Sequence, residues 1–468
     1  MLDGPSSNGH AALVTPAEVN QDLVGRTSSS GTLFRGALGV TGAMLVLGIV
    51  GLAMKLSEGT DVTSNWGYYA AAFAFTLTTA QGAVIVAIAP RIAKAHWRRS
   101  ISRIAELFAA VGLFNFLVFL PLLWVLPSLA DGRRTLWFYD AADPDYSQVP
   151  QYAPHIWAVL SVGFLALVGV MLLWLSSVPD LAAERDRGGA RFGGMAKRWY
   201  GTSRQWFIQY HRLGMLGAFY FMMLVSTHFL IAVDFNMSLI PGWIDALYPA
   251  TQAANSLHAG CAIVIVAMYI ARRWGGLEQY IGLDQFWGLG KLMFALSLLW
   301  FWFWFSSFIV LWYGARPNEQ AILDLLIREP YWPAFVASFV LNFLTPLWVL
   351  MWNMVRKSIL GPTLVAVGIL VGTFFDRIRF YVAAYSVDGI GDPSVAKHTL
   401  AGAVPAFVPP DLSDVLVWMG VIGGSVFAYL IATRIFPVVN IWEQREVLLY
   451  RVHKPFHRTE VLVLGKPD

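Results

Sequence analysis

A series of long apolar segments constrains this chain more than any other feature of its sequence. About 20 apolar residues of helix, at 1.5 Å each, are needed to cross a hydrocarbon core about 30 Å thick. Ten segments of the 468-residue chain come close to or exceed this length, at about 36–57, 67–90, 104–127, 155–178, 207–233, 249–271, 286–314, 331–354, 358–384 and 412–435. Because these segments are continuous rather than alternating, they favour helices and argue against a transmembrane barrel. We therefore expect an all-α integral membrane protein with about ten spans.

The composition excludes a soluble enzyme. Hydrophobic residues make up 57% of the chain and charged residues 13%, whereas an average soluble domain has about 45–50% and about 25%. The polar residues are too few to cover a globule of this size. The single cysteine, Cys261, excludes an internal disulfide, an iron–sulfur cluster and a CxxCH haem within the chain. The net charge of only +4 gives no sign of a nucleic-acid partner.

The positions of the basic residues predict the orientation, because cytoplasmic loops are enriched in Lys and Arg. With ten spans and a cytoplasmic N-terminus, 23 of the 33 Lys and Arg fall in cytoplasmic segments. We therefore predict a cytoplasmic tail at 1–35, a transmembrane domain at 36–435 and a second cytoplasmic tail at 436–468. The first 30 residues are polar, so we expect neither a signal peptide nor a span there.

Two outer loops, at 128–154 and 385–411, are long for connections between helices and rich in Pro, Asp and Tyr. Loops of this length are often functional. We interpret them as a docking surface for an extracytoplasmic partner; mobile surface loops are the alternative.

Polar side chains within the spans are the first functional candidates, because ionisable groups are costly in the membrane. His228 lies near the outer end of the fifth segment, and Asp234 follows one to two turns later. His258 in the sixth segment lies at a similar depth. The same zone toward the outer leaflet includes Gln81, Ser306, Ser307, Asp376, Arg377 and Arg379.

This combination fits a quinol site. A quinol head group needs a hydrogen-bond partner for each oxygen and a group that accepts its proton on oxidation. Histidine titrates near neutrality, and a carboxylate can pass the proton onward. We therefore predict His228 and Asp234 as the functional pair. Haem b between His228 and His258 is a competing use of the histidines.

The other polar residues have structural alternatives. Asp376 and Arg377 could form an ion pair that joins helices, and His258 could make an interhelical hydrogen bond. Ser306 and Ser307 are expected to bond to their own helix. Near the inner face, we expect Glu106 to be a surface carboxylate rather than the start of a proton path. Arg212 and Lys291 are expected to reach the head groups by snorkelling.

Four motifs carry a resemblance to a known family. They are STHFLIAVDFNMSLIPGW (226–243), ARRWGGLEQYI (271–281), LWYGARPNE (311–319) and GTFFDRIRFYV (372–382). Together they resemble the NrfD/PsrC family, the integral-membrane quinone-binding subunits of polysulfide-reductase-type complexes, over about residues 65–385. With ten spans and an N-terminal tail, the chain is most similar to the quinol-interacting membrane subunits of alternative complex III.

The resemblance implies two four-helix bundles with flanking helices, in a bacterial or archaeal cytoplasmic membrane. It implies a bound quinone such as menaquinol near the outer face, and neither haem nor metal in this subunit. Electrons would pass to an extracytoplasmic iron–sulfur subunit, and thence to a molybdoenzyme-like or cytochrome c subunit. Other membrane subunits would assemble with the chain, which would not be catalytic alone. By position, His228, Asp234, Asp376 and Arg377 match polar positions of the family.

The chain also departs from the family pattern. Gln81 stands where relatives often carry a histidine. A second histidine of the family, near the end of the third span, is replaced here by the apolar segment FLPLLWVLP (119–127). Ser306 or Ser307 stands in place of an acidic residue. These departures weaken the case for proton translocation and for quinol turnover. A structural or proton-conducting anchor therefore remains an alternative. A secondary transporter is a third, although no paired interrupted helices are evident from the sequence.

Overall fold

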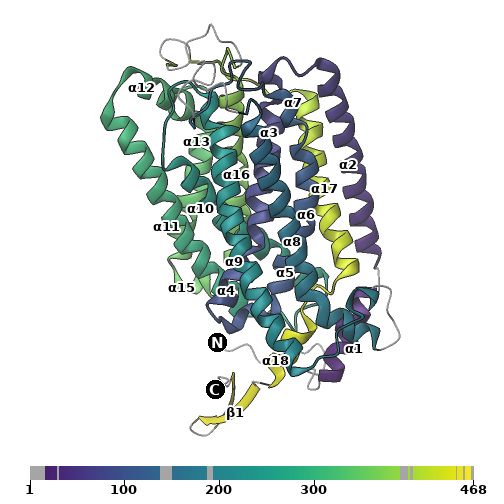
Figure 1. Cartoon of the computed structure of the whole chain (residues 1–468). Coiled ribbons are helices and arrows are strands. Elements are labelled where there is room, and N and C mark those ends of the chain that lie inside the picture. The colour runs from purple at the N-terminus through teal and green to yellow at the C-terminus, as the bar shows by residue number, and fades with distance from the viewer. Residues whose placement is uncertain are drawn as a thin grey trace.

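The computed structural model describes residues 16–28, 31–137, 150–186, 193–390, 399–400, 404–449, 451–456 and 459–464. The described chain is a bundle of long, roughly parallel helices with one β-hairpin beyond the last of them (Figure 1). Each of the ten predicted segments is helical. This confirms the prediction of an all-α, multi-pass membrane protein.

Four of the spans are single uninterrupted helices of the first half and the centre of the chain: α2 (Thr32–Glu58), α8 (Ala153–Arg185), α9 (Ser203–Asp234) and α10 (Tyr248–Trp274). Three more follow: α11 (Leu283–Gly314), α16 (Leu360–Tyr385) and α17 (Leu412–Ile435). The second span consists of η1 (Thr63–Trp66), α3 (Gly67–Thr76), the π-helix η2 (Leu77–Gln81) and α4 (Ile85–Ile92). The third consists of α5 (Ser102–Glu106), α6 (Ala109–Phe119) and α7 (Leu122–Val125). The eighth consists of α13 (Trp332–Phe339), the π-helix η8 (Val340–Leu344) and α14 (Thr345–Leu350).

Shorter elements connect or flank the spans. They are α1 (Pro16–Ser28), η3 (His96–Ser100), η5 (Gly193–Ala196), η6 (Met237–Leu239), α12 (Pro317–Leu323), η7 (Asp324–Arg328), α15 (Asn353–Arg356) and α18 (Ile441–Leu449). The strands β1 (Arg451–Phe456) and β2 (Thr459–Leu464) pair antiparallel.

Nine of the ten spans are long and apolar enough to cross a membrane by length and composition alone, among the residues that the structure describes. The remaining one, α16, carries Asp376, Arg377 and Arg379 in its second half. It is 26 residues long, which is sufficient to span about 30 Å, and it packs between α3, α10 and α13. These charges are buried inside the protein rather than exposed to lipid.

The helices form two groups of four. The second to fifth spans pack together through contacts of α6 with α8, α8 with α9, and α4 with α9. The sixth to ninth pack through contacts of α10 with α11 and α16, and of α13 with α16. The helices α2 and α17 form a flanking pair, and α17 contacts α3 and α6 (Figure 1). The predicted pair of bundles with flanking helices is therefore observed.

Glycines allow the closest helix crossings. A Cβ atom on Gly48 of α2 would lie 2.2 Å from the Cα atom of Gly420 of α17. A Cβ atom on Gly260 of α10 would lie 2.5 Å from the carbonyl of Gly82, where the two bundles meet. In a membrane, where helices gain little from the hydrophobic effect, such close backbone approach supplies much of the packing.

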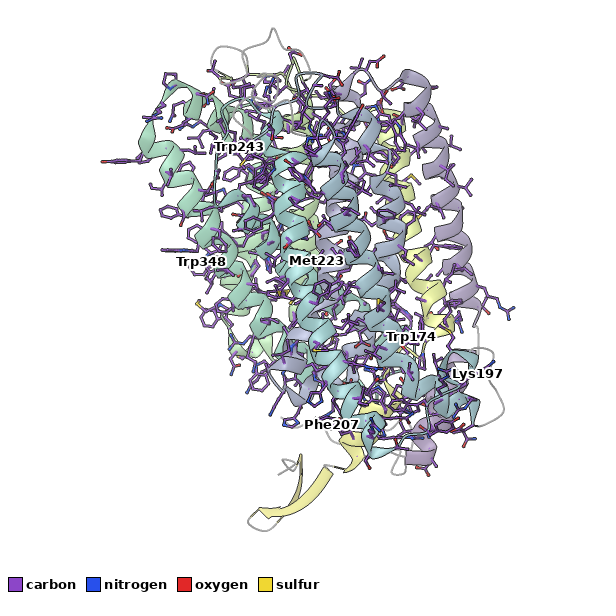
Figure 2. The ribbon with its side chains drawn as sticks, viewed as in Figure 1. Trp174, Lys197, Phe207, Met223, Trp243 and Trp348 are labelled. Carbon is purple, nitrogen blue, oxygen red and sulfur yellow. The ribbon has the colours of Figure 1, made fainter. Side chains whose placement is uncertain are left out.

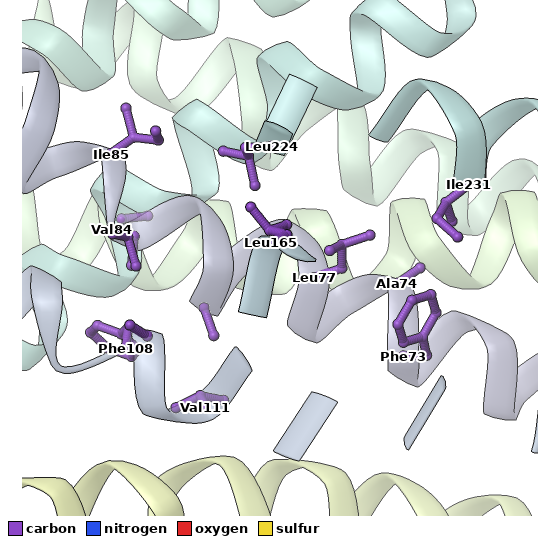
Figure 3. Packing of buried hydrophobic residues seen from close by; sticks show 14 of the residues in the cluster. Phe73, Ala74, Leu77, Val84, Ile85, Phe108, Val111, Leu165, Leu224 and Ile231 are labelled. Atoms are coloured by element: carbon purple, nitrogen blue, oxygen red, sulfur yellow. The ribbon is translucent and has the colours of Figure 1, made fainter. Parts of the chain in front are cut away.

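The interior of the first bundle is a continuous apolar core. Side chains from four spans meet there, including Phe73, Leu77, Val111, Leu165 and Leu224 (Figure 3). The second span lies at the centre and is almost completely buried, whereas most of α2 is exposed on the outer surface of the bundle. Exposed aromatic side chains such as Trp348 project from the sides (Figure 2).

The helices α1 and α18 pack against each other at one end of the bundle (Figure 1). We call this the inner end, because the distribution of basic residues predicts that it is cytoplasmic. The opposite, outer end carries the segments 126–137 and 404–411. Part of the predicted docking loops lies outside the described residues, namely 138–149, 391–398 and 401–403. Their docking role stays a prediction.

Candidate functional site

Asp234, at the end of α9, is the centre of a first polar group at the outer end. The indole nitrogens of Trp137 and Trp157 donate to its two carboxylate oxygens, each over 2.7 Å. Arg133 donates to its backbone carbonyl over 2.5 Å, and its charge also acts on the carboxylate. Asp234 is only 1% exposed. Two N–H donors and a nearby guanidinium offset part of the cost of burying this carboxyl group.

The segment 128–137 folds over the end of α9 and forms the roof of this group. Arg133 is buried and approaches His155 of α8, with 3.4 Å between its Nη1 and the histidine Nε2. Arg134 donates to the carbonyl of Leu239 over 2.5 Å and to that of Asp388 over 3.3 Å. Burial lowers the pKa of Arg134 from 12.5 to about 10, so this side chain is still cationic at neutral pH.

Sequence reasoning missed Arg133, Trp137, Trp157 and His155 as members of the site. One signal was available: Arg133 and Arg134 are adjacent basic residues in a predicted outer loop, against the usual enrichment of basic residues inside. An unexpected cationic pair on the outer side indicates that its charges are used by the protein.

A second polar group lies around Asp376 of α16. Its carboxylate pairs with Arg377 over 2.6 Å and with Arg379 over 2.7 Å. Arg377 also donates to Gln252 of α10, and Asn255 of α10 lies 3.5 Å from the carboxylate. The predicted ion pair is therefore present. It forms within α16, and the amides of α10 extend it to the neighbouring helix.

The surroundings of His228 differ from those of Asp234. Its Nδ1 is 2.8 Å from the carbonyl of Leu224, one turn earlier in α9. Its Nε2 is buried and has no hydrogen-bond partner among the described residues. Arg377 is close enough for its charge to act on the imidazole. The two predicted functional residues are six positions apart, a rise of about 9 Å, and they have different partners.

Tyrosines connect the two polar groups. The Tyr385 hydroxyl is buried without a partner among the described residues, and both Arg133 and Tyr381 act on it electrostatically. Tyr248 donates to Asn236 over 2.8 Å. Trp243 packs against Tyr248 with ring centroids 4.5 Å apart, near the outer end (Figure 2). Buried tyrosines and tryptophans thus surround both polar groups in the described part of the outer end.

His258 and Gln81 lie in the contact between α10 and the second span. His258 is completely buried, and neither ring nitrogen has a partner among the described residues. The expectation of a satisfied interhelical hydrogen bond is therefore wrong. Gln81 accepts a hydrogen bond from Asn115 over 3.1 Å, but its amide nitrogen has no partner in the same described part. Unpaired buried polar atoms cost about 1–3 kcal/mol each, which makes them candidates for contact with a ligand.

The expectation that Ser307 bonds to its own helix is also wrong. Its hydroxyl donates to the carboxylate of Asp245, which lies before α10. The same carboxylate accepts the backbone N–H groups of Leu247 and Tyr248 over 2.8 and 3.2 Å. Ser307 therefore joins α11 to the start of α10.

Glu106 is not a surface carboxylate as predicted. It is completely buried at the inner end, 2.9 Å from Arg91 and 3.1 Å from Arg103. Arg103 also pairs with Asp180 over 3.1 Å, and Glu443 of α18 pairs with Arg91 and Arg98. The six side chains of this inner cluster carry three positive and three negative charges: Arg91, Arg98, Arg103, Glu106, Asp180 and Glu443. The surface assignment failed because Glu443, which closes the cluster, lies far away in the sequence.

Arg212 and Lys291 are exposed on α9 and α11, and their snorkelling to the head groups stays a prediction. No group of three or more His, Cys, Asp or Glu side chains among the described residues could hold a metal ion.

Comparisons with known proteins agree with the resemblance described above. A family model described as "Polysulphide reductase, NrfD" matches residues 57–387. A protein of Halobacterium salinarum, named as a putative membrane subunit of a dimethyl sulfoxide reductase, is 30% identical over 167 residues. That alignment covers 34% of this chain and 35% of the relative, so it spans about a third of the relative's length.

Proposed function

The chain belongs to the NrfD polysulphide reductase family, and from this premise we propose that it is the quinol-interacting membrane subunit of an oxidoreductase complex. It exchanges electrons between the membrane quinone pool, such as menaquinol, and a partner subunit on the outer side. The match to a relative named as a membrane subunit of a reductase supports this class of complex. The assembly is of the alternative complex III kind or of the molybdoenzyme kind.

The observation that carries the proposal is the setting of Asp234. A carboxylate at the outer end, flanked by two tryptophan rings and a buried arginine, can accept a proton from a quinol hydroxyl. The indole of Trp137 comes from the roof segment and is 47% exposed, so it is the donor that a quinol hydroxyl replaces. The rings of Trp137 and Trp157 pack edge to face, with centroids 6.1 Å apart, and give the carboxylate an apolar surrounding against which a quinone ring can lie.

His228, with its unpaired Nε2, contributes the second hydrogen bond to the head group. Asp376 and Arg377 hold the polar layer behind it. His258 and Gln81 lie deeper, and their unpaired atoms line the inner side of the same layer. These assignments give a role to the unpaired polar atoms of His228, His258 and Gln81.

Electrons leave the chain for metal centres in a partner. The sequence has one cysteine, and Cys261 is buried, so the chain offers no ligand set for an iron–sulfur cluster. The outer loops 128–154 and 385–411 dock an extracytoplasmic iron–sulfur subunit directly above Asp234. That subunit passes electrons to a molybdoenzyme-like or cytochrome c subunit.

One observation favours the alternative of a structural or proton-conducting anchor. Both oxygens of Asp234 already accept hydrogen bonds from the protein, so the group is stable without a ligand. The transporter alternative gains less. The π-helical turns η2 and η8 interrupt the second and eighth spans. The second span is the first helix of its bundle, whereas the eighth is the third helix of its own. A transporter with two related halves would have its interruptions at corresponding positions.

The test is quinol oxidation by the assembled complex after replacement of Asp234 or His228 by alanine. We expect turnover to fall about 100-fold, the usual contribution of a proton-accepting group, with all subunits retained. The matched control is Asp61→Ala, because Asp61 is an exposed carboxylate at the same outer end and lies outside both docking loops. Unchanged turnover in both site variants would refute the site. Loss of subunits from the complex without an effect on the residual specific activity would favour the anchor.

A further inference from the structure

A cavity of about 870 Å³ opens at the outer end, on the side of the second bundle that faces α2 and α17. Its walls come chiefly from α13, α16 and α17. Phe374 and Trp418 pack edge to face there, with ring centroids 4.6 Å apart. Among its lining residues are none of the side chains assigned above to the Asp234 site. The cavity is therefore a separate feature of the described structure.

The cavity is reached from the side that faces lipid. Trp332, Phe407 and Val415 line it and are about half exposed, at 53%, 51% and 48%. These apolar side chains lie around the outer half of a membrane-spanning bundle, where acyl chains surround the protein. A ligand with an apolar tail can therefore enter sideways from the membrane.

The end of the cavity next to the start of α17 carries its polar groups. Asp414 of α17 forms an ion pair with the buried Lys55 over 2.7 Å, and the Tyr68 hydroxyl donates to the Val408 carbonyl over 2.8 Å. The indole nitrogen of Trp418 is buried and has no acceptor among the described residues. Because Asp414 and Trp418 are four residues apart, they lie on the same face of α17, with Cβ atoms about 6 Å apart.

We propose that this cavity binds the head group and first isoprene units of a neutral prenyl quinol, as a second quinone site in the protein. One quinol hydroxyl donates to the Asp414 carboxylate. The oxygen on the opposite side of the ring accepts the Trp418 N–H. One turn of α17 matches the separation of two oxygens across a quinol ring, and the volume lies within the usual range for sites of small ligands.

The charge and length of the cavity argue against other occupants. Lys55 neutralises Asp414, but Glu329 in the lining and Asp411, 3.9 Å from Lys55, add two further carboxylates at the polar end. An anionic phospholipid head group would meet two carboxylates there. Along α17 the cavity extends from Asp414 to Ile422, about 12 Å at 1.5 Å per residue. A partner's transmembrane helix would need a groove of about 30 Å.

The experiment uses a photoreactive azidoquinone with a short prenyl tail, applied to the full-length protein in lipid nanodiscs, with the labelled peptides identified by mass spectrometry. We expect label within residues 330–334 and 412–422. Ala334→Trp, which fills the cavity, should lower this labelling at least fivefold. Leu364→Trp on the lipid-facing side of α16 is the matched control, because Leu364 is 69% exposed and does not line the cavity. It should leave labelling unchanged.

Trp418→Phe tests the hydrogen bond without filling the cavity and should lower labelling severalfold. Absence of label from both peptides, or full labelling of a stably folded Ala334→Trp variant, would overturn the proposal. So would displacement by phosphatidylglycerol as effective as displacement by unlabelled quinone. Asp234→Ala should lower turnover about 100-fold and leave this labelling intact, so failure at one site is distinguishable from failure at the other.

Discussion

Replacing Arg103 by glutamine should destabilise the protein by about 3–5 kcal/mol. Arg103 is completely buried and pairs with Glu106 and Asp180, each over 3.1 Å. At an effective dielectric constant of about 20, each pair contributes about 5 kcal/mol of attraction, or about 10 kcal/mol for both. The desolvation of the guanidinium offsets much of this. The net cost is that of removing one partner from a buried pair, about 3–5 kcal/mol.

The charge balance of the inner cluster makes this prediction sharper. Arg103→Gln leaves two cations facing three carboxylates, whereas Arg103→Gln with Asp180→Asn restores two against two. We therefore expect the double variant to recover at least about 2 kcal/mol of the loss. Arg212→Gln, at an exposed position on α9, is the control and should stay within about 0.5 kcal/mol of the wild type.

The free energy of unfolding can be measured by titrating dodecyl sulfate into mixed micelles and following tryptophan fluorescence. Wild-type stability of Arg103→Gln would refute the reasoning altogether. A double variant no more stable than the single one would show that the lost hydrogen bonds, among them the 3.0 Å bond to the Ser176 carbonyl, and not the unbalanced charge, determine the cost.

Three further outcomes are expected. In the same titration, Gly420→Ala should weaken the packing of α2 on α17 by about 1–3 kcal/mol. Gly39→Ala is the control, because a Cβ atom there would meet nothing within 4 Å. Equal effects of the two substitutions on the free energy of unfolding would contradict the close crossing. Burial alone would raise the pKa of Glu443, but Arg98 and Arg91 outweigh it and hold that pKa below its ordinary value of 4.5. Glu443 therefore stabilises the docking of α18 above about pH 4.5, and this contribution is lost as the pH falls through the lowered pKa. Hydrogen exchange of residues 441–449, corrected for intrinsic rates, should therefore accelerate as the pH falls below about 4.5. The same acceleration in a Glu443→Gln variant would show that Glu443 is not its cause. Arg134→Ala should expose the roof segment 128–137 to proteolysis severalfold faster, because it removes the bonds to Leu239 and Asp388; an unchanged cleavage rate would show that other contacts hold the segment.

The spans were predictable because the membrane imposes one length on every helix. The tenth predicted segment has the same ends as α17 (Leu412–Ile435), and the fifth segment, 207–233, ends one residue before α9 does. Even α16 was found, since its first half is apolar although its second half carries three charges. Because each span has the same length, the depth of a polar residue could also be predicted from its position within its span.

The partners of the polar residues were not predictable, because they come from distant segments. The two indole donors to Asp234 are 97 and 77 residues away from it in the chain. Glu106 was assigned to the surface because α18, which covers its cluster, lies beyond all ten spans. Ser307 had a possible acceptor on its own helix, and only the packing of α11 against the start of α10 gave it Asp245 instead. Side-chain pairing in such a bundle depends on helix rotation, which hydropathy does not encode.

The inner cluster has a consequence for how the chain is made. Arg91 reaches Glu443 across 352 residues of sequence, so the ribosome must synthesise every span before the cluster can become neutral. Until then the three arginines face two carboxylates, so this inner end carries an excess positive charge. The arrival of α18 neutralises them and lets that end of the bundle close. Completion of the fold is thereby coupled to completion of translation, and a chain that stops before residue 443 keeps an uncompensated positive charge at its inner end.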